Sequence, residues 1–409
     1  MQEKKKLPLI WKIAIGFLLG IVLGFIVGPM ATKSVFIADI LLPALDLVGK
    51  IFLSLLKMLI VPLVFSSIIT GAASIGDPKV LGRIGVKTVA LYLTTTVVAV
   101  SLGLILGNII APGVGLSIEG AMGEAKQGAT IMEVILGIFP ANPLNALVEG
   151  KMLQVIVFVL FLGISATLVG EKGKRLLEFN ESLAETMYRM TGIVMLTAPI
   201  GVFALISVTA AKYGVSVLAP FAKVIIAVFL GCILQTIIVY SGMITLYIKK
   251  SPLWFFSGIK EAMLAAFVTR SSSGVLPISM RNVQENLGVS EKVSSFVLPL
   301  GATINMDGTA IYQGICALFI AQAFGIDLHF TEQLGIILTA TLASIGTAGV
   351  PGAGLIMLSM VLTSAGLPIE GIGLVAGIDA VLDMARTCVN VTGDMCVSTI
   401  VAKSEGEKF

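Results

Sequence analysis

The chain has 409 residues, of which 56% are hydrophobic and only 12% are charged. Its mean hydropathy is +1.02, a value that water-soluble domains of this size do not reach, so that class is excluded. The formal net charge of +3 is too small to indicate nucleic acid as a partner. The composition therefore predicts a membrane protein that crosses the bilayer several times.

Long apolar runs dominate the chain up to about Tyr247. The runs at residues 10–27, 88–110, 152–169 and 225–248 are each near or above the roughly 20 residues that cross a hydrocarbon core of about 30 Å. Over the whole chain, hydropathy predicts an all-α membrane protein with about eight transmembrane helices plus two re-entrant helical hairpins.

The basic residues predict the orientation of the chain, because lysine and arginine favour cytoplasmic loops. Residues 4–6 are all lysine and place the N-terminus in the cytoplasm. Counting spans alternately from there, the basic segments at 79–87, 172–175 and 249–250 fall on the same side, and residues 111–130 fall outside. We expect a multi-pass protein of the cell membrane with both termini cytoplasmic.

Two apolar runs in the second half are interrupted before they could span a bilayer. Residues 253–280 are broken by Arg-Ser-Ser-Ser-Gly at 270–274, and residues 334–362 are broken by a glycine-rich stretch at 344–354. Irregular backbone at membrane depth is tolerated only where protein or a wet cavity surrounds it. Paired broken segments are the best sequence indication of a transporter's binding site, so each run is predicted to form a re-entrant hairpin.

Each predicted hairpin is followed by a long predicted helix, at residues 294–323 and at 372–401. A hairpin and a helix that occur twice in the same order are the pattern of an inverted repeat. This interpretation rests on hydropathy alone, because the two units share no visible sequence identity.

The densest polar cluster falls on the second of these helices. At about 100° per residue, its polar side chains share an arc of about 100°, which is one helix face. They are Asp379, Asp383, Arg386, Thr387, Asn390 and Asp394. A lone Asn or Thr would more readily be structural glue between helices. Several acids and an arginine on one stripe instead indicate a substrate or ion pathway.

A second polar cluster, Gly-Ala-Thr-Ile-Asn-Met-Asp-Gly-Thr at residues 301–309, interrupts the helix after the first hairpin. Asn305 and Gly308 loosen helical geometry and would free carbonyl oxygens beside the carboxylate of Asp307. Oxygen ligands of this kind suit a hard cation. The alternative is a kinked helix that is simply packed in the bundle.

The charges in this region limit the class of ligand that would fit. Asp307, Asp379, Asp383 and Asp394 outnumber Arg270 and Arg386, and bound cations would complement the excess, because isolated charges in a low dielectric need partners. The fork of Arg386 can hold a carboxylate and Asp383 can hold an ammonium group, so an anionic amino acid would satisfy both. A salt bridge from Arg386 to Asp383 or Asp379 is the alternative.

Four motifs resemble those of the dicarboxylate/amino acid:cation symporter family, most closely its prokaryotic sodium-coupled aspartate and glutamate branch. They are Thr-Arg-Ser-Ser-Ser-Gly at 269–274, Asn-Met-Asp-Gly-Thr at 305–309, Gly-Thr-Ala-Gly-Val-Pro-Gly at 346–352 and the long motif at 383–394. The motifs follow the family's order and the resemblance covers nearly the whole chain.

The resemblance implies a homotrimer in the lipid bilayer that works by elevator-type alternating access. In each protomer a transport domain would move the site across the membrane past a scaffold. By the family pattern, the scaffold comprises residues 1–85 and the trimerisation helices at 112–215, and the transport domain comprises the helix at 86–111 and residues 216–409, with hairpins at 253–289 and 331–367.

The resemblance also implies the residues of each site. Arg386 would bind the side-chain carboxylate of an acidic amino acid and Asp383 its amino group. The other substrate-binding residues would be Thr387, Asn390, Thr309, Ser272, Val350 and Gly354. Sodium ions would be held by Gly301, Asn305, Asn390 and Asp394, by Thr303, Met306, Ser344, Ile345 and Thr347, and by Tyr92, Thr95, Thr96, Asn305 and Asp307. Arg270 is expected to give electrostatic support near the cation sites.

Two retained residues indicate the transported species. Proton-coupled relatives tend to lack the last acid of the long motif, and neutral amino acid relatives tend to lack its arginine. Because this chain keeps Asp394 and Arg386, we expect symport of L-aspartate and/or L-glutamate with co-transported Na+. A proton-coupled symporter, or a neutral amino acid or dicarboxylate symporter of the same fold, is the alternative.

Interpretations from other classes explain less of the sequence. An intramembrane aspartyl protease could use Asp307 and Asp394, but a carboxylate dyad leaves Arg386, Asn390 and the two hairpins without a role. A channel would not need two hairpins that gate a site at the midplane. The sequence has no phosphate-cradling loop, which argues against drive by ATP. We therefore expect a transporter and not an enzyme.

Overall fold

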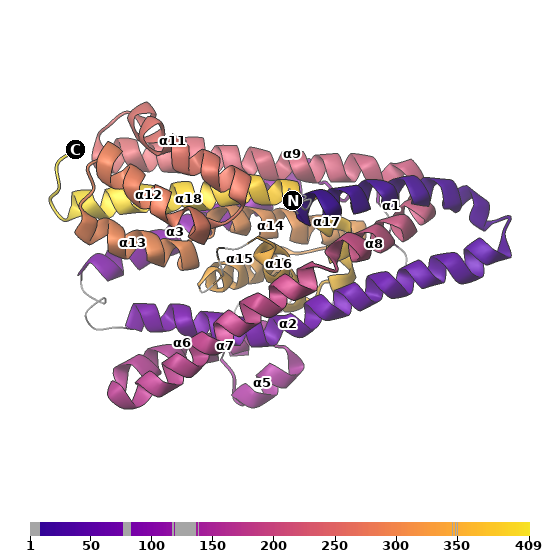
Figure 1. Cartoon of the computed structure of the whole chain (residues 1–409), viewed down its shortest axis with the longest axis horizontal. Helices are drawn as coiled ribbons and strands as arrows, with labels where there is room; N and C mark the ends of the chain where they lie inside the picture. Colours follow the sequence, from indigo (N-terminus) through magenta and orange to yellow (C-terminus); the bar gives the residue numbers. More distant parts are fainter. Residues whose placement is uncertain are drawn as a thin grey trace, which may run out of the picture.

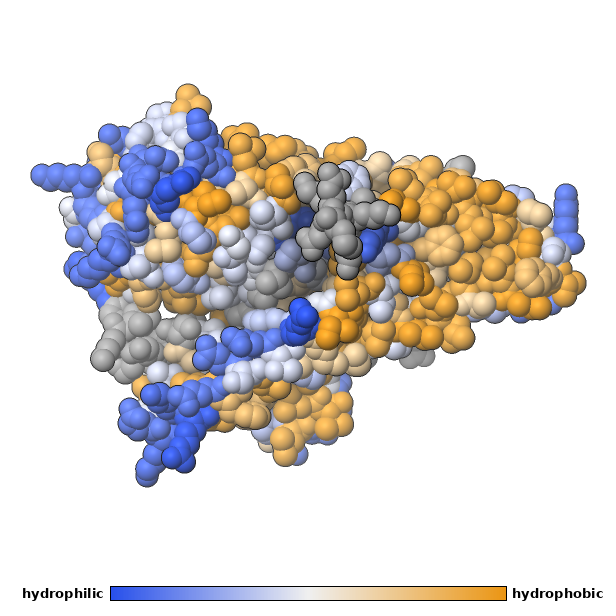
Figure 2. Space-filling model, viewed as in Figure 1, coloured by the Kyte–Doolittle hydropathy of each residue, from blue (hydrophilic) through white to orange (hydrophobic). Residues whose placement is uncertain are grey.

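The structure is a computed structural model that describes residues 9–76, 83–116, 118, 136–137, 139–345, 347, 349 and 351–409. Every regular element within these residues is a helix, which confirms the predicted all-α class. Most of the long helices run along the long axis of the molecule (Figure 1). The visible surface is apolar along much of the length of the molecule, and hydrophilic residues gather at the end that holds the C-terminus (Figure 2).

Several described helices are long and apolar enough to cross a membrane. They are Trp11–Ala31, Ile37–Gly71, Arg83–Ile110 and Leu218–Ile248. The pair Glu171–Met195 and Ala198–Tyr213 also qualifies as one span, bent by 52° at its break. These helices support a multi-pass membrane protein. The expectation of about eight spans stays a prediction, because other helices are shortened by breaks.

The described helices pack into two groups. The first consists of α1 (Leu9–Ala31), η1 (Ile37–Leu41), α2 (Leu42–Gly76), α5 (Pro143–Glu149), α6 (Met152–Leu168), α7 (Glu171–Met195) and α8 (Ala198–Tyr213). Within it, α1 lies along α8 (Figure 1). Glycines at every fourth position of α1, residues 16, 20, 24 and 28, allow this close approach. A Cβ atom on Gly24 would lie 2.5 Å from the Cβ atom of Ala210.

The second group surrounds the C-terminal helix. Its N-terminal members are α3 (Arg83–Ile110), α9 (Leu218–Leu234), η3 (Gln235–Tyr240), α10 (Ser241–Met243) and η4 (Ile244–Ile248), and η2 (Gly214–Val217) joins α8 to α9. α18 (Asp379–Ser404) packs against α3, α9, α11, α13 and α14, and it lies among them in Figure 1. The helix with the polar stripe is therefore buried on several sides.

The two interrupted segments break where the sequence predicts. The first forms α11 (Pro252–Thr269) and α12 (Ser272–Arg281), extended by η5 (Asn282–Asn286). The second forms α15 (Phe330–Ser344) and α16 (Ala353–Ser364). In each segment the two helices pack against one another. Their re-entrant placement in a membrane stays a prediction.

Both helices that follow the hairpins are broken. The first divides at Asn305 and Met306 into α13 (Glu291–Ile304) and α14 (Asp307–Ala323), as the polar cluster there predicts. The second was expected to be continuous over residues 372–401, and this expectation was wrong. After η6 (Ile369–Gly371), α17 (Ile372–Ala376) ends at a turn, and α18 begins at Asp379. The turn lies at Gly377, which packs directly against the Phe17 ring and leaves no space for a side chain.

The two groups meet where α16 and α17 pack against α2 and α8. An ion pair crosses the same boundary, from Lys57 Nζ on α2 to Glu370 Oε1 in η6 at 2.9 Å. Because this pair is exposed to its surroundings, it adds little to stability. It does show that the turn after the second hairpin contacts the first group, as α16 and α17 do.

The glycine stripe of α1 gives a test of the fold. Gly24→Ala should lower the melting temperature in detergent, because overpacking costs about 1–3 kcal/mol. Gly192→Ala in α7 is the matched control, since no atom lies within 4 Å of the added methyl group and alanine favours a helix by about 1 kcal/mol over glycine. Equal melting temperatures for the two variants would contradict the close packing of α1 on α8.

Candidate functional site

The polar stripe of α18 is buried along its length. Its predicted members are all less than a tenth exposed, namely Asp379, Asp383, Arg386, Thr387, Asn390 and Asp394. They face α13, α14 and the first hairpin, which all pack on α18. The prediction that these side chains share one face of one helix is confirmed. Buried ionisable groups need partners, and those partners divide the stripe into two clusters.

The first cluster is built around Arg386, whose side chain is completely buried. Its Nη1 donates to Asp379 Oδ1 at 2.8 Å and its Nη2 donates to Asp383 Oδ1 at 2.9 Å. The guanidinium carbon lies 4.0 Å from the centre of the Tyr312 ring, an arrangement that adds a cation–π attraction. The alternative that Arg386 forms salt bridges with its neighbours is thus correct for this structure, with both aspartates.

The two aspartates hold different nitrogens of the guanidinium fork, Nη1 and Nη2. Gly354 of α16 lies against the guanidinium, and a Cβ atom there would be 2.8 Å from the Cζ atom of Arg386. The second hairpin therefore closes directly over the arginine.

Arg270 lies beside the same cluster, at the break of the first hairpin. Its Nη1 is 4.0 Å from Asp383 Oδ2. That oxygen accepts no hydrogen bond from the described residues. The residue was expected to support the cation sites, whereas its described ion pair is with Asp383. Two arginines and two aspartates therefore balance in charge within the first cluster.

The tips of the two hairpins touch each other next to this cluster. Ser271 Oγ donates to the carbonyl oxygen of Gly349 at 2.8 Å, and the Ser273 backbone N–H donates to the same oxygen at 3.3 Å. Ser272, predicted to bind substrate, is buried between them at the start of α12, where the helix dipole favours an anion. Val350, also predicted, lies outside the described residues.

The second cluster contains Asp394. Asn305 Nδ2 donates to Asp394 Oδ1 at 2.9 Å and lies 3.2 Å from the carbonyl oxygen of Asn390. Gly301 leaves room beside them, since a Cβ atom there would be 2.5 Å from Asp394 Oδ1. One predicted cation group, Gly301 with Asn305, Asn390 and Asp394, is thus brought together.

Asp307 lies in the same cluster at the start of α14 and is completely buried. Thr96 Oγ1 donates to its Oδ1 at 2.7 Å, and Tyr240 OH and Gln235 Nε2 donate to its Oδ2 at 2.8 and 3.2 Å. Thr95 Oγ1 reaches Asn305 Oδ1 at 3.4 Å. The predicted group on α3 and α14 is therefore assembled, with Tyr92 buried on the same helix as the threonines.

Gln235 and Tyr240 were missed by sequence reasoning. Both lie in η3, a π-helical turn within the long apolar run of residues 225–248. Wide turns of this kind occur often at functional sites. A glutamine and a tyrosine inside an apolar run are a sequence signal for a buried polar site. The signal is weak because neither side chain is charged.

The remaining predicted cation group is less complete. Met306 Sδ lies 3.2 Å from Asn390 Nδ2, and Thr303 Oγ1 donates to Leu300 O. Ser344 and Thr347 donate to carbonyl oxygens of their own hairpin, Thr341 O and Ala343 O. Among the described hydrogen bonds, none joins the members on α13 to those near the end of α15, including Ile345. Their assembly into one site stays a prediction.

The two clusters differ in their charge balance. Asp379 and Asp383 face arginines, whereas Asp307 and Asp394 accept hydrogen bonds only from neutral groups in the part of the chain that the structure describes. The described residues contain no group of three or more His, Cys, Asp or Glu side chains that could hold a metal ion. Mixed carboxylate, amide, hydroxyl and carbonyl oxygens instead suit a hard cation.

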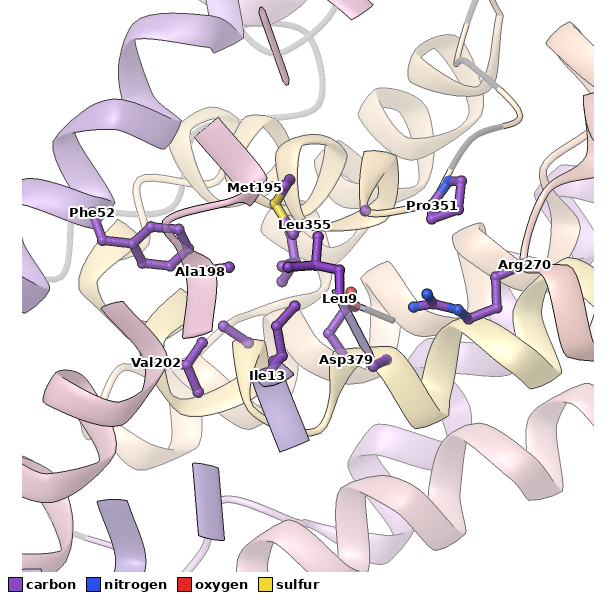
Figure 3. A pocket seen from close by; sticks show the side chains of 13 residues that line it. Leu9, Ile13, Phe52, Met195, Ala198, Val202, Arg270, Pro351, Leu355 and Asp379 are labelled. Carbon is purple, nitrogen blue, oxygen red and sulfur yellow. The ribbon is translucent and has the colours of Figure 1, made fainter. Parts of the chain in front are cut away.

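A cavity beside Arg270 and Asp379 reaches the boundary between the two helix groups (Figure 3). Apolar residues of the first group, including Phe52 and Val202, line one side of it, and Pro351 and Leu355 of the second hairpin line another. This small cavity is therefore lined both by charged residues of the first cluster and by apolar residues of the first group of helices.

A helical membrane protein with paired broken helices and a buried, self-paired charge cluster is in the class of secondary transporters. The chain belongs to the sodium:dicarboxylate symporter family, whose model matches residues 9–404. The resemblance found from the four motifs is thereby confirmed, and the family is one of transporters.

Named relatives cover almost the same length. The chain is 38% identical to the proton/sodium-glutamate symport protein of Geobacillus stearothermophilus, over 98% of this chain and 96% of the relative. It is 36% identical to the proton/glutamate-aspartate symporter of Escherichia coli, over 98% and 93%. It is 35% identical to the C4-dicarboxylate transport protein of Rhodospirillum rubrum, over 89% and 83%.

The contact between the second hairpin and Arg386 can be tested by adding one methyl group. Gly354→Ala should lower the melting temperature, because the new atom would meet the guanidinium at 2.8 Å and overpacking costs about 1–3 kcal/mol. Gly335→Ala, on the other helix of the same hairpin, has nothing within 4 Å of its added methyl group and serves as control. An unchanged melting temperature for Gly354→Ala would show that Arg386 does not pack there.

Proposed function

We propose that this protein is a sodium-coupled secondary active symporter of acidic amino acids, L-aspartate and/or L-glutamate. The observation that supports it best is the pairing of Arg386 with two aspartates beside two further buried carboxylates that have no basic partner among the described residues. The first arrangement suits a zwitterionic ligand with an extra carboxylate, and the second suits monovalent cations. The glutamate and aspartate symporters among the relatives support the same substrate class.

Substrate binding is an exchange of ionic partners in this proposal. The side-chain carboxylate of the amino acid displaces Asp383 from Nη2 of Arg386, while Asp379 and the Tyr312 ring keep hold of the guanidinium. The released Asp383 carboxylate then accepts the ammonium group of the substrate. The exchange avoids leaving any buried charge without a partner, which would cost several kcal/mol.

The remaining carboxylate of the substrate is directed to the start of α12. Ser272 and its neighbours offer hydroxyl and backbone N–H groups there, together with the positive end of the helix dipole. Gly354 of the second hairpin lies directly against the guanidinium, where a side chain would meet the arginine. Thr309, Thr387, Asn390 and Val350 complete the set of proposed substrate-binding residues.

Asn390 gives a physical route for coupling between substrate and sodium. Its Oδ1 accepts from the Gly308 backbone N–H at 2.8 Å, and its Nδ2 lies 3.3 Å from Thr309 Oγ1. Its own carbonyl oxygen lies 3.2 Å from Asn305 Nδ2, which also holds Asp394. A cation at Asp394 and a substrate at Thr309 would therefore influence the same residue, the first through its backbone carbonyl and the second through its side chain, as coupled binding requires.

The proposed movement follows the division of the helices. Residues 86–111 and 216–409 would form the transport domain, and residues 1–85 and 112–215 the scaffold of a homotrimer, in an elevator-type cycle. The packing into two groups that meet at α16 and α17 supports this division. The Lys57–Glu370 ion pair and the cavity lined by Phe52 and Leu355 lie on the boundary that would slide.

Cytoplasmic termini are part of the same proposal. Arg83 and Lys87, in the basic segment assigned to the cytoplasm, form ion pairs with Glu405 at 2.7 and 2.8 Å. The end of α18 is therefore on the same side as that segment. The two cations lower the pKa of Glu405 to about 2, so this link persists at any physiological pH.

Replacing the arginine tests the choice of substrate. Arg386→Cys should weaken L-aspartate binding by at least about 30-fold, because truncating one member of a buried charge pair costs about 2–5 kcal/mol. Binding of a neutral amino acid such as L-serine should persist or improve. Isothermal titration in saturating NaCl measures both, and Arg281→Cys is the control, because that arginine pairs with Glu261 on an exposed surface. Retained aspartate affinity would refute the assignment of Arg386.

Replacing a carboxylate tests the choice of cation. Asp394→Asn should raise the sodium concentration for half-maximal aspartate binding about tenfold or more, a shift of about 1.4 kcal/mol. The preference for aspartate over serine should remain, since Arg386 is intact. Asp327→Asn, an exposed aspartate, provides the comparison. An unchanged sodium titration would rule out a cation site at Asp394.

A further inference from the structure

Arg270 occupies an unusual backbone position for an arginine. It ends α11 with φ +56° and ψ 35°, in the left-handed region that residues with a Cβ atom rarely adopt. Its backbone N–H donates to Ala266 O at 2.9 Å, which fixes the turn. Strained backbone of this kind at a ligand site is a reason to ask what the side chain does.

The side chain of Arg270 is directed into the site and is only 16% exposed. Figure 3 shows its guanidinium reaching from the first hairpin toward Asp379 and the cavity. Its Nη1 lies 4.0 Å from Asp383 Oδ2, close enough for attraction but too far for a hydrogen bond. The two oxygens of Asp383 therefore have different partners: Oδ1 accepts a hydrogen bond from Arg386, and Oδ2 faces Arg270.

This asymmetry matters once a ligand carboxylate displaces Asp383 from Arg386. Asp383 would then be a buried anion that needs a new cation within reach. An amino acid brings an ammonium group for it. A dicarboxylate without an amino group brings none, and Arg270 is then the charged residue already beside the free oxygen. Arg270 and the ammonium group are both cations, so either can be the counter-charge of the Asp383 carboxylate, the ammonium group in the amino acid complex and Arg270 in the dicarboxylate complex.

We propose that Arg270 is a specificity-determining residue that supplies the counter-charge of Asp383 when the ligand has no ammonium group. It thereby sets how strictly the site requires an amino group. This inference rests on the proposed function, because it assumes that an acidic amino acid binds between Arg386 and Asp383.

The expected loss of affinity for a ligand without an amino group follows from the cost of leaving a buried polar group without a partner. A site built to hydrogen-bond a polar group of its substrate rejects the analogue that lacks the group by roughly 10⁴–10⁵-fold. With Arg270 in place, the loss of the amino group should cost less, below about 10³-fold, because Asp383 retains a partner. Without Arg270, discrimination should approach the full range.

The test compares L-aspartate with succinate, which is aspartate without its amino group. Dissociation constants are measured on the purified full-length protein in saturating NaCl, by direct titration for aspartate and by competition for succinate. Arg270→Met should raise the ratio of the succinate constant to the aspartate constant at least tenfold. Arg270→Lys keeps the charge and should leave the ratio within about threefold of the unmodified protein. Arg281→Met, on the same hairpin but paired with exposed Glu261, should leave it unchanged.

The outcomes separate failure of this inference from failure of the proposed function. If the unmodified protein binds aspartate and the ratio does not rise in Arg270→Met, Arg270 does not set the requirement for an amino group. A ratio of 10⁴ or more in the unmodified protein overturns the inference without any variant, so a misfolded variant would not leave it undecided. If the unmodified protein binds neither ligand, the proposed function itself fails.

Discussion

The rest of the site depends on one buried cation, Arg386, held between Asp379 and Asp383 and covered by the Tyr312 ring. A guanidinium completely removed from solvent is tolerated only with anionic partners. By placing both partners on its own helix, the chain keeps the arginine neutralised without a ligand. In the proposed function a ligand must match the displaced aspartate in charge and geometry, so these salt bridges would select for an acidic group.

The carboxylates of the second cluster, Asp394 on the stripe and Asp307 on α14, have no counter-charge of this kind among the described residues. Asp307 and Asp394 are hydrogen-bonded by hydroxyl and amide groups, which orient their oxygens but do not cancel their charge. The break between α13 and α14 brings both into one region. In the proposed function, these two clusters, one with balanced charge and one without, are joined through Asn390 and couple the substrate to the cation.

Sequence reasoning could locate the stripe on α18 and the breaks at Arg270, Asn305 and near Gly349, because charge in an apolar run and small residues are strong local signals. It could not find Tyr312, which contributes through its ring face, or Gln235 and Tyr240, whose role depends on long-range packing against Asp307. The turn at Gly377 was missed because it is imposed by contact with Phe17, which lies far away in sequence. Tertiary contacts, unlike local periodicity, leave no pattern in one sequence.

The most direct test of the account is uptake of radiolabelled L-aspartate into proteoliposomes, with an inward sodium gradient compared with an inward proton gradient at a fixed membrane potential. The account predicts accumulation with sodium and none with protons alone, because in the proposed function Asp307 and Asp394, which have only neutral hydrogen-bond donors among the described residues, bind sodium. Accumulation with protons alone would mean that these carboxylates carry protons instead. Absence of uptake under both gradients would contradict the assignment of an acidic amino acid as the substrate.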